Sequence, residues 1–182
     1  MQANIALGLL ETSSIARGVE AVDVMCKAAG VDLLQSYSTS RGKFIIMIAG
    51  PVGEVESSLR AGTDAAKDVV MESYIIRNVH KDVLASIGKK LPYTKLEAVG
   101  FVETKDIIPA VYAADIAAKA AAVKMIEIRA GAGIGGKGFF SLTGEVGAVR
   151  SAVSAAVNAI GPEKVVSRIV IPNAHELLNK AL

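Results

Sequence analysis

The sequence predicts an α+β protein made of two tandem ferredoxin-like units, each with the element order β-α-β-β-α-β. The first observation is an internal repeat, since Ala-Leu-Gly-Leu-Leu-Glu-Thr (6–12) returns as Ala-Val-Gly-Phe-Val-Glu-Thr (98–104). The second is that strand-like runs and helical stripes follow one another in the same order in both halves. We therefore place one domain at residues 1–90 and the other at 96–182, with a linker at 88–93.

Each unit begins with a short strand and an amphipathic helix. Residues 4–10 are apolar and interrupted by glycine, which is typical of a strand, and the hydroxyls of Thr12, Ser13 and Ser14 can cap the helix that follows. This helix has one apolar stripe, which we expect to face the core: Ile15, Val19, Val22 and Cys26. The second unit repeats the stripe as Ile107, Val111, Ala114 and Ala118.

Two more strands, at 31–37 and 43–49, flank a polar connection at 38–42. The run Phe44–Ile48 is apolar on both faces, so we expect it at the centre of the sheet. We expect both helices of a unit on one face of an antiparallel sheet. A second helix and a last strand complete each unit, at 52–66 and 70–76 in the first and at 146–160 and 165–171 in the second.

Composition excludes several classes of protein. The chain is 52% apolar and 21% charged, which suits a packed core and argues against disorder. A net charge of +2, with no basic block, predicts no nucleic-acid partner. No apolar run reaches the roughly 18 residues of a membrane span, and the N-terminus lacks the features of a signal peptide. Together with a single cysteine, Cys26, this predicts a cytoplasmic protein without a membrane segment.

The glycine-rich segment 131–138 matches most of a phosphate-binding loop. Such loops hold phosphate at the start of a helix, whereas Phe139–Leu142 continues here as a predicted strand. Gly138 also stands where a P-loop needs Ser or Thr for magnesium. We therefore interpret the segment as a loop whose small residues let several copies lie close together.

The sequence offers no catalytic constellation, and we predict neither an enzyme nor a metal site. His80 and His175 occupy repeat-related positions at the start of short terminal helices, which favours capping or a subunit contact over a metal pair. Cys26 falls on the apolar stripe, so we expect a core thiol rather than a nucleophile. Two acid-to-base pairs, one helical turn apart, recur in both units: Asp23 with Lys27, and Asp115 with Lys119.

Several of these strings resemble the bacterial microcompartment shell domain. They are residues 6–12, Ala-Val-Asp-Val-Met-Cys-Lys-Ala-Ala (21–29), Gly-Pro-Val-Gly-Glu-Val (50–55) and the terminal Asn-Val-His (78–80). Two copies in unpermuted order look like the tandem-domain shell proteins, and most like the type associated with propanediol-utilisation shells. The resemblance implies a structural component of a microcompartment shell in the cytoplasm.

The resemblance also implies an assembly. Shell domains form six-membered rings, so a chain with two of them would close a pseudohexamer as a homotrimer. Such trimers would lie edge to edge with hexameric shell proteins. The resemblance places four residues at the tile edges, two of them asparagines where relatives commonly carry Arg: Lys27, Lys119, Asn78 and Asn173.

By resemblance, the connection between the second and third strands of each unit lines a central pore. The lining residues are Ser38, Thr39, Ser40, Arg41 and Gly42 from the first unit, and Ala132, Gly133, Ile134, Gly135 and Gly136 from the second. Because the two loops differ, we expect threefold rather than sixfold symmetry. Hydroxyls and guanidinium groups near the axis would favour small polar or anionic metabolites.

In the type with an iron–sulfur site, a loop Cys ligates a [4Fe–4S] cluster on the axis, and Ser40 aligns with that position. A hydroxyl is a poor replacement for a thiolate. We therefore expect no cofactor, and a [4Fe–4S] cluster only if Ser40 replaces a native Cys. Two alternatives stay open, namely an electron-transfer conduit with an axial cluster and a ferredoxin-like domain that senses a small ligand.

Overall fold

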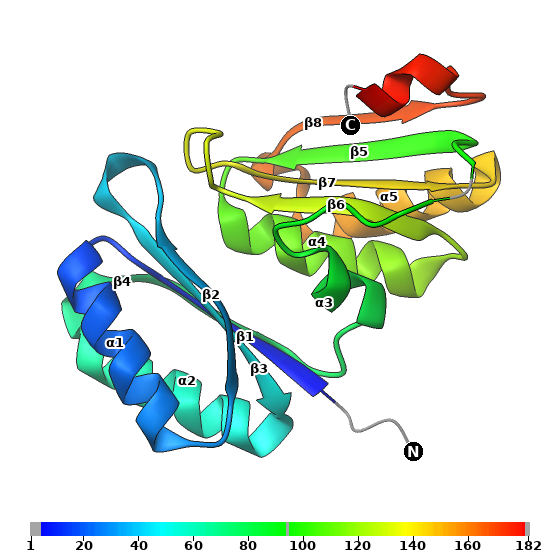
Figure 1. Cartoon of the computed structure of the whole chain (residues 1–182). Coiled ribbons are helices and arrows are strands. Elements are labelled where there is room, and N and C mark those ends of the chain that lie inside the picture. The colour runs from blue at the N-terminus through cyan, green and yellow to red at the C-terminus, as the bar shows by residue number, and fades with distance from the viewer. Residues whose placement is uncertain (1–4, 94, 181–182) are drawn as a thin grey trace. The chain divides into compact units, whose positions relative to one another are not determined.

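The computed structural model describes residues 5–93 and 95–180 (Figure 1). The chain divides into two compact units, with the boundary in the sequence between Val79 and His80. Each unit contains a four-stranded antiparallel sheet with two long helices on one face, as Figure 1 shows. This confirms the predicted α+β class and the ferredoxin-like order in both repeats. Asn4, where we began the first strand, lies outside the described residues.

The first unit has the sheet order β2-β3-β1-β4. Its elements are β1 (Ile5–Thr12), α1 (Ile15–Ala28), β2 (Asp32–Ser38), β3 (Phe44–Pro51), α2 (Val52–Ala66) and β4 (Val70–Ile76), with short 3₁₀ turns η1 (Ser40–Gly42) and η2 (Lys67–Val69).

The second unit has the equivalent order β6-β7-β5-β8. Its elements are α3 (Lys81–Ser86), β5 (Ala98–Thr104), α4 (Ile107–Ala120), β6 (Lys124–Ala130), β7 (Gly138–Gly144), α5 (Val146–Ile160) and β8 (Val165–Ile171), with 3₁₀ turns η3 (Pro162–Lys164) and η4 (Glu176–Lys180).

The core of the first unit lies between the sheet and its helices. β3 is a central strand buried along most of its length, as its apolar sequence predicts. Leu10, Ile46 and Ile48 of the sheet pack against Met25 of α1 and Val55 of α2. Burying aliphatic side chains of this size contributes roughly 1.5–3 kcal/mol each. At the start of α1, the Ser14 hydroxyl accepts a hydrogen bond from the Arg17 backbone at 3.4 Å, so the predicted serine cap is present.

The prediction that the Ile15–Cys26 stripe of α1 faces the core is wrong for three of its four residues. α1 buries Gly18, Ala21 and Met25 instead, and Cys26 is an exposed thiol. Of the stripe, Ile15 and Val19 are exposed as well, and only Val22 packs against the core. The copy of the stripe on α4 is buried, because α4 buries residues on nearly all sides.

The segment after β4 packs on the second sheet. α3 contacts α4 and β6, and the backbone N–H groups of Gly88 and Leu91 donate to the carbonyls of Ile128 and Ile126 at 3.2 and 2.7 Å. We predicted from the sequence that the first domain ends at residue 90, which assigns residues 80–90 to it. In space, these residues extend the second unit, where they cover the outer edge of β6.

Candidate functional site

The two predicted loops occupy the same place in the two sheets. One joins β2 to β3 and the other joins β6 to β7, so each connects an edge strand to a central strand. The hairpins close at matching pairs, Ser38 opposite Phe44 and Ala130 opposite Gly138. Within each unit, Figure 1 shows this loop projecting beyond one end of the sheet. The ten loop residues that we predicted as a lining therefore fall into two repeat-related hairpin ends.

The first loop is a tight turn with an exposed cation. The Thr39 backbone N–H donates to the Lys43 carbonyl at 2.8 Å, which closes the turn. Arg41 has a φ of 64° and Gly42 a φ of 72°, both in the left-handed region. An L-residue such as Arg41 pays roughly 1–2 kcal/mol for this conformation. The turn holds the Arg41 side chain in solvent, whereas Ser40 is half-buried.

The second loop has no ionisable side chain between residues 131 and 136. Gly131, Gly133, Gly135 and Gly136 all have positive φ values between 72° and 83°, which glycine adopts without steric cost. The chain then enters β7 directly at Gly138, so no helix follows and no helix dipole faces the loop. This agrees with the interpretation that the segment is not a phosphate site, while close packing of several copies stays a prediction.

A lysine–glutamate pair stands at the base of each loop. Lys43 Nζ lies 3.2 Å from Glu11 Oε1 in the first unit, and Lys137 Nζ lies 2.8 Å from Glu103 Oε1 in the second. The first pair is largely buried and the second is more exposed. Sequence reasoning missed both pairs, although the glutamates close the repeated strings at 6–12 and 98–104 and so carried a signal.

The base of the second loop also holds an aromatic stack. Phe101 and Phe139 stack with ring centroids 4.7 Å apart, and the Arg129 guanidinium lies 5.2 Å from the centre of the Phe139 ring. The same guanidinium donates to Glu127 at 2.7 Å. These contacts fix the two strand ends from which the glycine-rich loop emerges.

In the first unit, Tyr37 takes the place that Arg129 has in the second. Burial raises the pKa of the Tyr37 phenol to about 12, because the phenolate would lose solvation there. Tyr37 is therefore neutral at physiological pH. Lys43 is paired with Glu11, so the exposed charge of the first loop is that of Arg41.

Both histidines cap the segments that follow them. His80 Nδ1 accepts a hydrogen bond from the Asp82 backbone at 3.3 Å, and His175 Nδ1 accepts one from Leu177 at 3.2 Å. The predicted capping role is confirmed. Among residues 5–93 and 95–180, no group of three or more His, Cys, Asp or Glu side chains is arranged to hold a metal ion.

The four predicted edge residues all lie at least partly in solvent. Lys27 Nζ contacts Asp23 at 2.6 Å and Lys119 Nζ contacts Asp115 at 2.5 Å, which confirms both i, i+4 pairs. Asn78 and Asn173 are exposed and have φ values of 51° and 49°. Asparagine tolerates this left-handed conformation better than most residues, which gives a backbone reason for asparagine at both positions.

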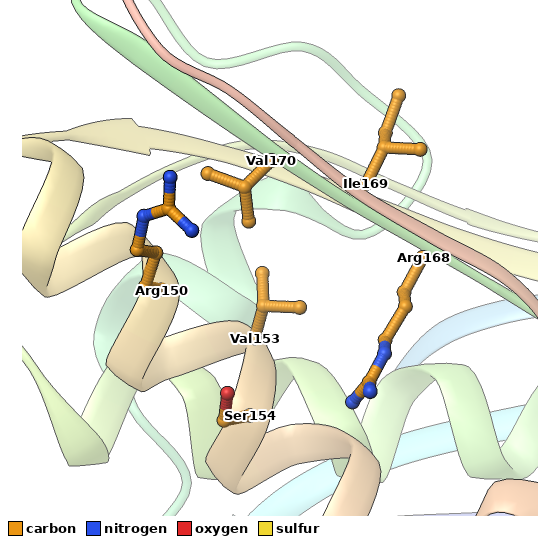
Figure 2. Close-up of a pocket in the computed structure, with 6 residues that line it drawn as sticks. All are labelled: Arg150, Val153, Ser154, Arg168, Ile169 and Val170. Atoms are coloured by element: carbon orange, nitrogen blue, oxygen red, sulfur yellow. The ribbon is translucent and has the colours of Figure 1, made fainter.

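A surface depression of about 400 Å³ lies between α5 and β8 (Figure 2). Figure 2 shows Arg150 and Arg168 on either side of Val153 and Ser154. Neither arginine makes an ion pair with a carboxylate in the part of the chain that the structure describes. The depression is positively charged and lies at the β8 edge of the second sheet, and none of the predicted loop residues lines it. None of the helices in the described residues is long and apolar enough to cross a bilayer.

Two repeat-related ferredoxin-like units, with loops at the equivalent end of each sheet, define a tandem-domain protein built by duplication. A model of the BMC domain matches residues 6–79 and again 98–174, which is one match in each unit. The chain therefore belongs to the BMC domain family, whose members build the shells of bacterial microcompartments, and its role is that of a shell component.

Individual relatives agree with this assignment. The chain is 40% identical over 172 residues to the bacterial microcompartment shell protein PduT of Citrobacter freundii, with 94% of each chain covered. It is 34% identical over 93 residues to the carboxysome shell protein CsoS1C of Hydrogenovibrio crunogenus, which covers 48% of this chain and 91% of that protein. The shorter match corresponds to one unit.

Solved structures extend the agreement to three dimensions. A crystal structure of a microcompartment protein from Desulfitobacterium hafniense matches with a TM-score of 0.92 and 44% identity, covering 98% of this chain and 99% of the other. The fused permuted hexameric shell protein MSM0275 of the RMM microcompartment matches with a TM-score of 0.63 and 26% identity, over 88% and 85% of the two chains. These relatives give no support to the electron-transfer or ligand-sensing alternatives.

Proposed function

We propose that three copies of this chain close into a pseudohexameric ring that forms one tile of a microcompartment shell. The supporting observation is the equivalence of the two units, which share strand order, hairpin register and loop position. A chain with two equivalent units offers two like surfaces, and a head-to-tail contact between chains closes when the rotation permits. A ring of six units then requires three chains.

The mass of the assembly tests this proposal. Native mass spectrometry or sedimentation equilibrium of the unmodified protein is expected to give three times the 18.8 kDa chain mass. A stable monomer across the micromolar range would contradict the ring. A hexamer of chains would also contradict it, because twelve units would be present.

We further propose that the loops at 38–42 and 132–136 surround the central opening and that small polar or anionic metabolites cross it. Two observations support this proposal. Both loops lie at the projecting ends of equivalent hairpins, and Ile134 is their only large apolar side chain. Three copies of Arg41 would raise the local concentration of anions at the opening. The glycine-rich loops at 132–136 have few bulky side chains, so they would leave space for a metabolite between the Arg41 side chains.

Anion flux tests the pore. Closed shells that contain the chain and enclose an iodide-quenched fluorophore are expected to lose iodide influx when Arg41→Gln removes the three charges. Arg60→Gln, which removes an exposed charge from α2, is the matched control and should leave the flux unchanged. Equal flux in the unmodified and Arg41→Gln shells would contradict a pore at this loop.

We propose that the opening holds no iron–sulfur cluster. Ser40 begins the η1 turn at the aligned position, and neither loop contains a cysteine. A serine hydroxyl does not supply the thiolate that such clusters require. Anaerobic reconstitution with iron and sulfide is expected to leave the protein colourless, while Ser40→Cys should gain the brown thiolate-to-iron absorbance. Cluster formation by the unmodified protein would contradict this proposal.

We also propose a non-enzymatic role, with Lys27, Asn78, Lys119 and Asn173 on the tile edges that meet hexameric shell proteins. The support for this role is that both histidines act as repeat-related backbone caps through Nδ1 and that the BMC relatives are shell proteins. Co-assembly with a hexameric shell protein, followed by electron microscopy of sheets, tests the edge. Asn78→Asp, which keeps a residue type that tolerates the left-handed backbone at this position, is expected to reduce mixed sheets while the mass of the isolated ring stays unchanged.

A further inference from the structure

The first unit exposes a helix face that the second unit buries. Val19 on α1 is 54% exposed, whereas its repeat counterpart on α4, Val111, is 0% exposed. Ile15 is likewise exposed and its counterpart Ile107 is buried. Because the two faces have the same apolar sequence pattern, the difference lies in what covers them. An uncovered apolar face of this kind marks an interaction surface.

The neighbouring edge strand shows the same contrast. Leu34 on β2 is 38% exposed, and its counterpart on β6, Ile126, is 0% exposed. β6 is covered by the segment that runs through α3 to Leu91, whose backbone N–H donates to the Ile126 carbonyl at 2.7 Å. β2 has no such segment along its outer edge among the described residues. An unpaired strand edge is a template for a further chain.

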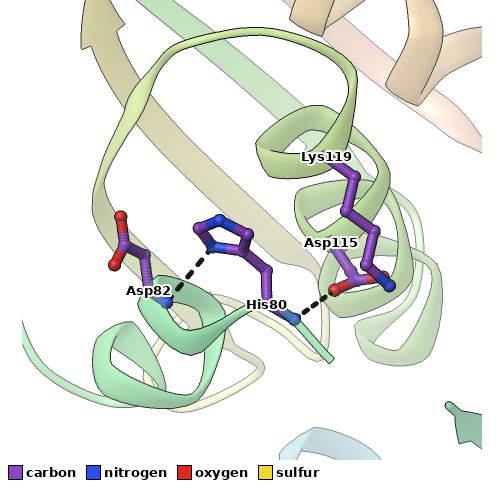
Figure 3. Close-up of polar contacts among 4 residues, drawn as sticks. All are labelled: His80, Asp82, Asp115 and Lys119. Atoms are coloured by element: carbon purple, nitrogen blue, oxygen red, sulfur yellow. Dashed lines mark hydrogen bonds and ion pairs between the residues drawn. The ribbon is translucent and has the colours of Figure 1, made fainter. Parts of the chain in front are cut away.

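A buried carboxylate anchors the segment that covers the second unit. The His80 backbone N–H donates to Asp115 Oδ1 at 2.8 Å, and the Asp115 side chain is 1% exposed (Figure 3). The counterpart of Asp115 is Asp23, whose side chain is 62% exposed. The first unit therefore carries the acceptor of this anchor with no segment docked on it.

Residues 174–178, the tail after β8, repeat the local hydrogen bonds of the segment that starts at Val79. The backbone N–H of Ala174 donates to Glu97, as that of Val79 donates to Ile5, at 2.8 and 2.9 Å. His175 then caps Leu177 through Nδ1 just as His80 caps Asp82. Leu178 and Val83 likewise both donate to the carbonyl of their histidine, at 2.9 and 3.0 Å.

The tail at 174–178 lacks the hydrogen bond to a carboxylate that His80 makes with Asp115. No acceptor for the His175 backbone N–H lies among the described residues, and Leu177 beside it is 61% exposed. The tail and the Asp23 face are both open in the single chain, and they correspond by repeat to the two sides of the His80–Asp115 contact.

We propose that residues 174–178 of one copy dock on the α1 and β2 face of a second copy, with the His175 backbone N–H donating to the Asp23 carboxylate. The occupant is a second copy, because the within-chain contact at Asp115 is the pattern for it and Asp23 stays open in the single chain. The inference rests on the proposed trimer and names the surface that closes it. The contact is head to tail, since the tail lies in the second unit and its acceptor in the first.

A disulfide trap tests the contact. Cysteines replace the two partners in a Cys26→Ser background, as Asp23→Cys with His175→Cys, and the protein is oxidised with copper phenanthroline. Disulfides need Cα atoms about 4.4–6.8 Å apart, a separation that a carboxylate-to-backbone hydrogen bond brings within reach. Non-reducing gels are expected to show covalent dimers that convert to a covalent trimer.

The chain supplies a matched control for the geometry. His80→Cys with Asp115→Cys, in the same background, places the pair at the contact that the structure already contains. It should lose both thiols on oxidation without any gain in mass. Each single cysteine variant shows how much cross-linking comes from collisions alone.

The outcomes separate this inference from the trimer itself. If the control pair oxidises, the unmodified protein has the mass of three chains and the 23/175 pair stays reduced, the docking site is wrong and the ring stands. A monomeric unmodified protein overturns both. Covalent dimers that never proceed to trimers overturn the head-to-tail contact, because they indicate a symmetric pairing.

Discussion

The backbone N–H of His80 and the carboxylate of Asp115 form the hydrogen bond that ties the segment after β4 to α4, at 2.8 Å (Figure 3). Lys119 contacts the other carboxylate oxygen at 2.5 Å, so both Asp115 oxygens have partners although the side chain is buried. A buried carboxylate with one cation and one N–H donor is stable only while both remain. This makes Asp115 the most informative single residue to change in the second unit.

Asp115→Ala is expected to lower the free energy of unfolding by about 2 kcal/mol, because it removes charge-assisted hydrogen bonds and leaves the His80 N–H without its acceptor. Hydrogen–deuterium exchange should show faster exchange across residues 80–91. Asp23→Ala is the control, since Asp23 is exposed in the single chain and its variant should leave exchange in 80–91 unchanged. Unchanged exchange in Asp115→Ala would show that α3 is held by other contacts.

The lysines at the base of the loops should differ in importance. Lys43→Met leaves the buried Glu11 carboxylate without this cation and is expected to cost about 3 kcal/mol. Lys137→Met removes a partly exposed pair and should cost less than about 1 kcal/mol, because solvent screens it. Urea unfolding followed by circular dichroism measures both. Equal costs would mean that burial does not set the strength of these pairs.

Much of the fold was predictable because local signals and the repeat pointed to the same elements. The apolar run Phe44–Ile48 indicated a central strand, and the serines before Ile15 indicated a helix start. The exposure of Cys26 to solvent could not be predicted in the same way. Periodicity shows which face of a helix is apolar, but not whether the chain itself or another molecule covers that face.

The candidate site was predictable in position and incomplete in detail. Aligning the repeats located both hairpin loops, and the strand after Gly138 excluded a P-loop. The Glu11 and Glu103 anchors were missed because a glutamate inside an apolar strand forms its pair with a lysine more than thirty residues away. Such a contact depends on strand pairing, which sequence spacing alone does not reveal.

Two glycines of α2 provide a test of packing within one helix. A Cβ at Gly62 would lie 2.4 Å from Met25 Cγ, and Met25 is fully buried, so Gly62→Ala is expected to destabilise the first unit by about 1–3 kcal/mol. A Cβ at Gly53 would meet no atom within 4 Å, so Gly53→Ala should stabilise by roughly 0.5–1 kcal/mol through helix propensity. Thermal unfolding should move in opposite directions for the two variants.

The half-buried phenol of Tyr37 should make the first unit sensitive to alkali. Its pKa in the folded protein is about 12 and its ordinary value is 10.0, because burial disfavours the phenolate. Below pH 10 the phenol is neutral in both states, and its full contribution to stability is present. Between pH 10 and 12 the unfolded chain loses the proton while the folded chain keeps it, so stability falls as pH rises through this window.

Tyr37→Phe removes this proton and is expected to flatten the loss of stability between pH 10 and 12. Absorbance at 295 nm should show one tyrosine titrating near pH 12 in the unmodified protein and not in Tyr37→Phe. Since Tyr37 lies directly before the loop at 38–42, the same titration reports on the packing at the base of that loop. If the titration that Tyr37→Phe removes lies near pH 10 instead, the phenol is open to solvent and β2 is looser there than the structure shows.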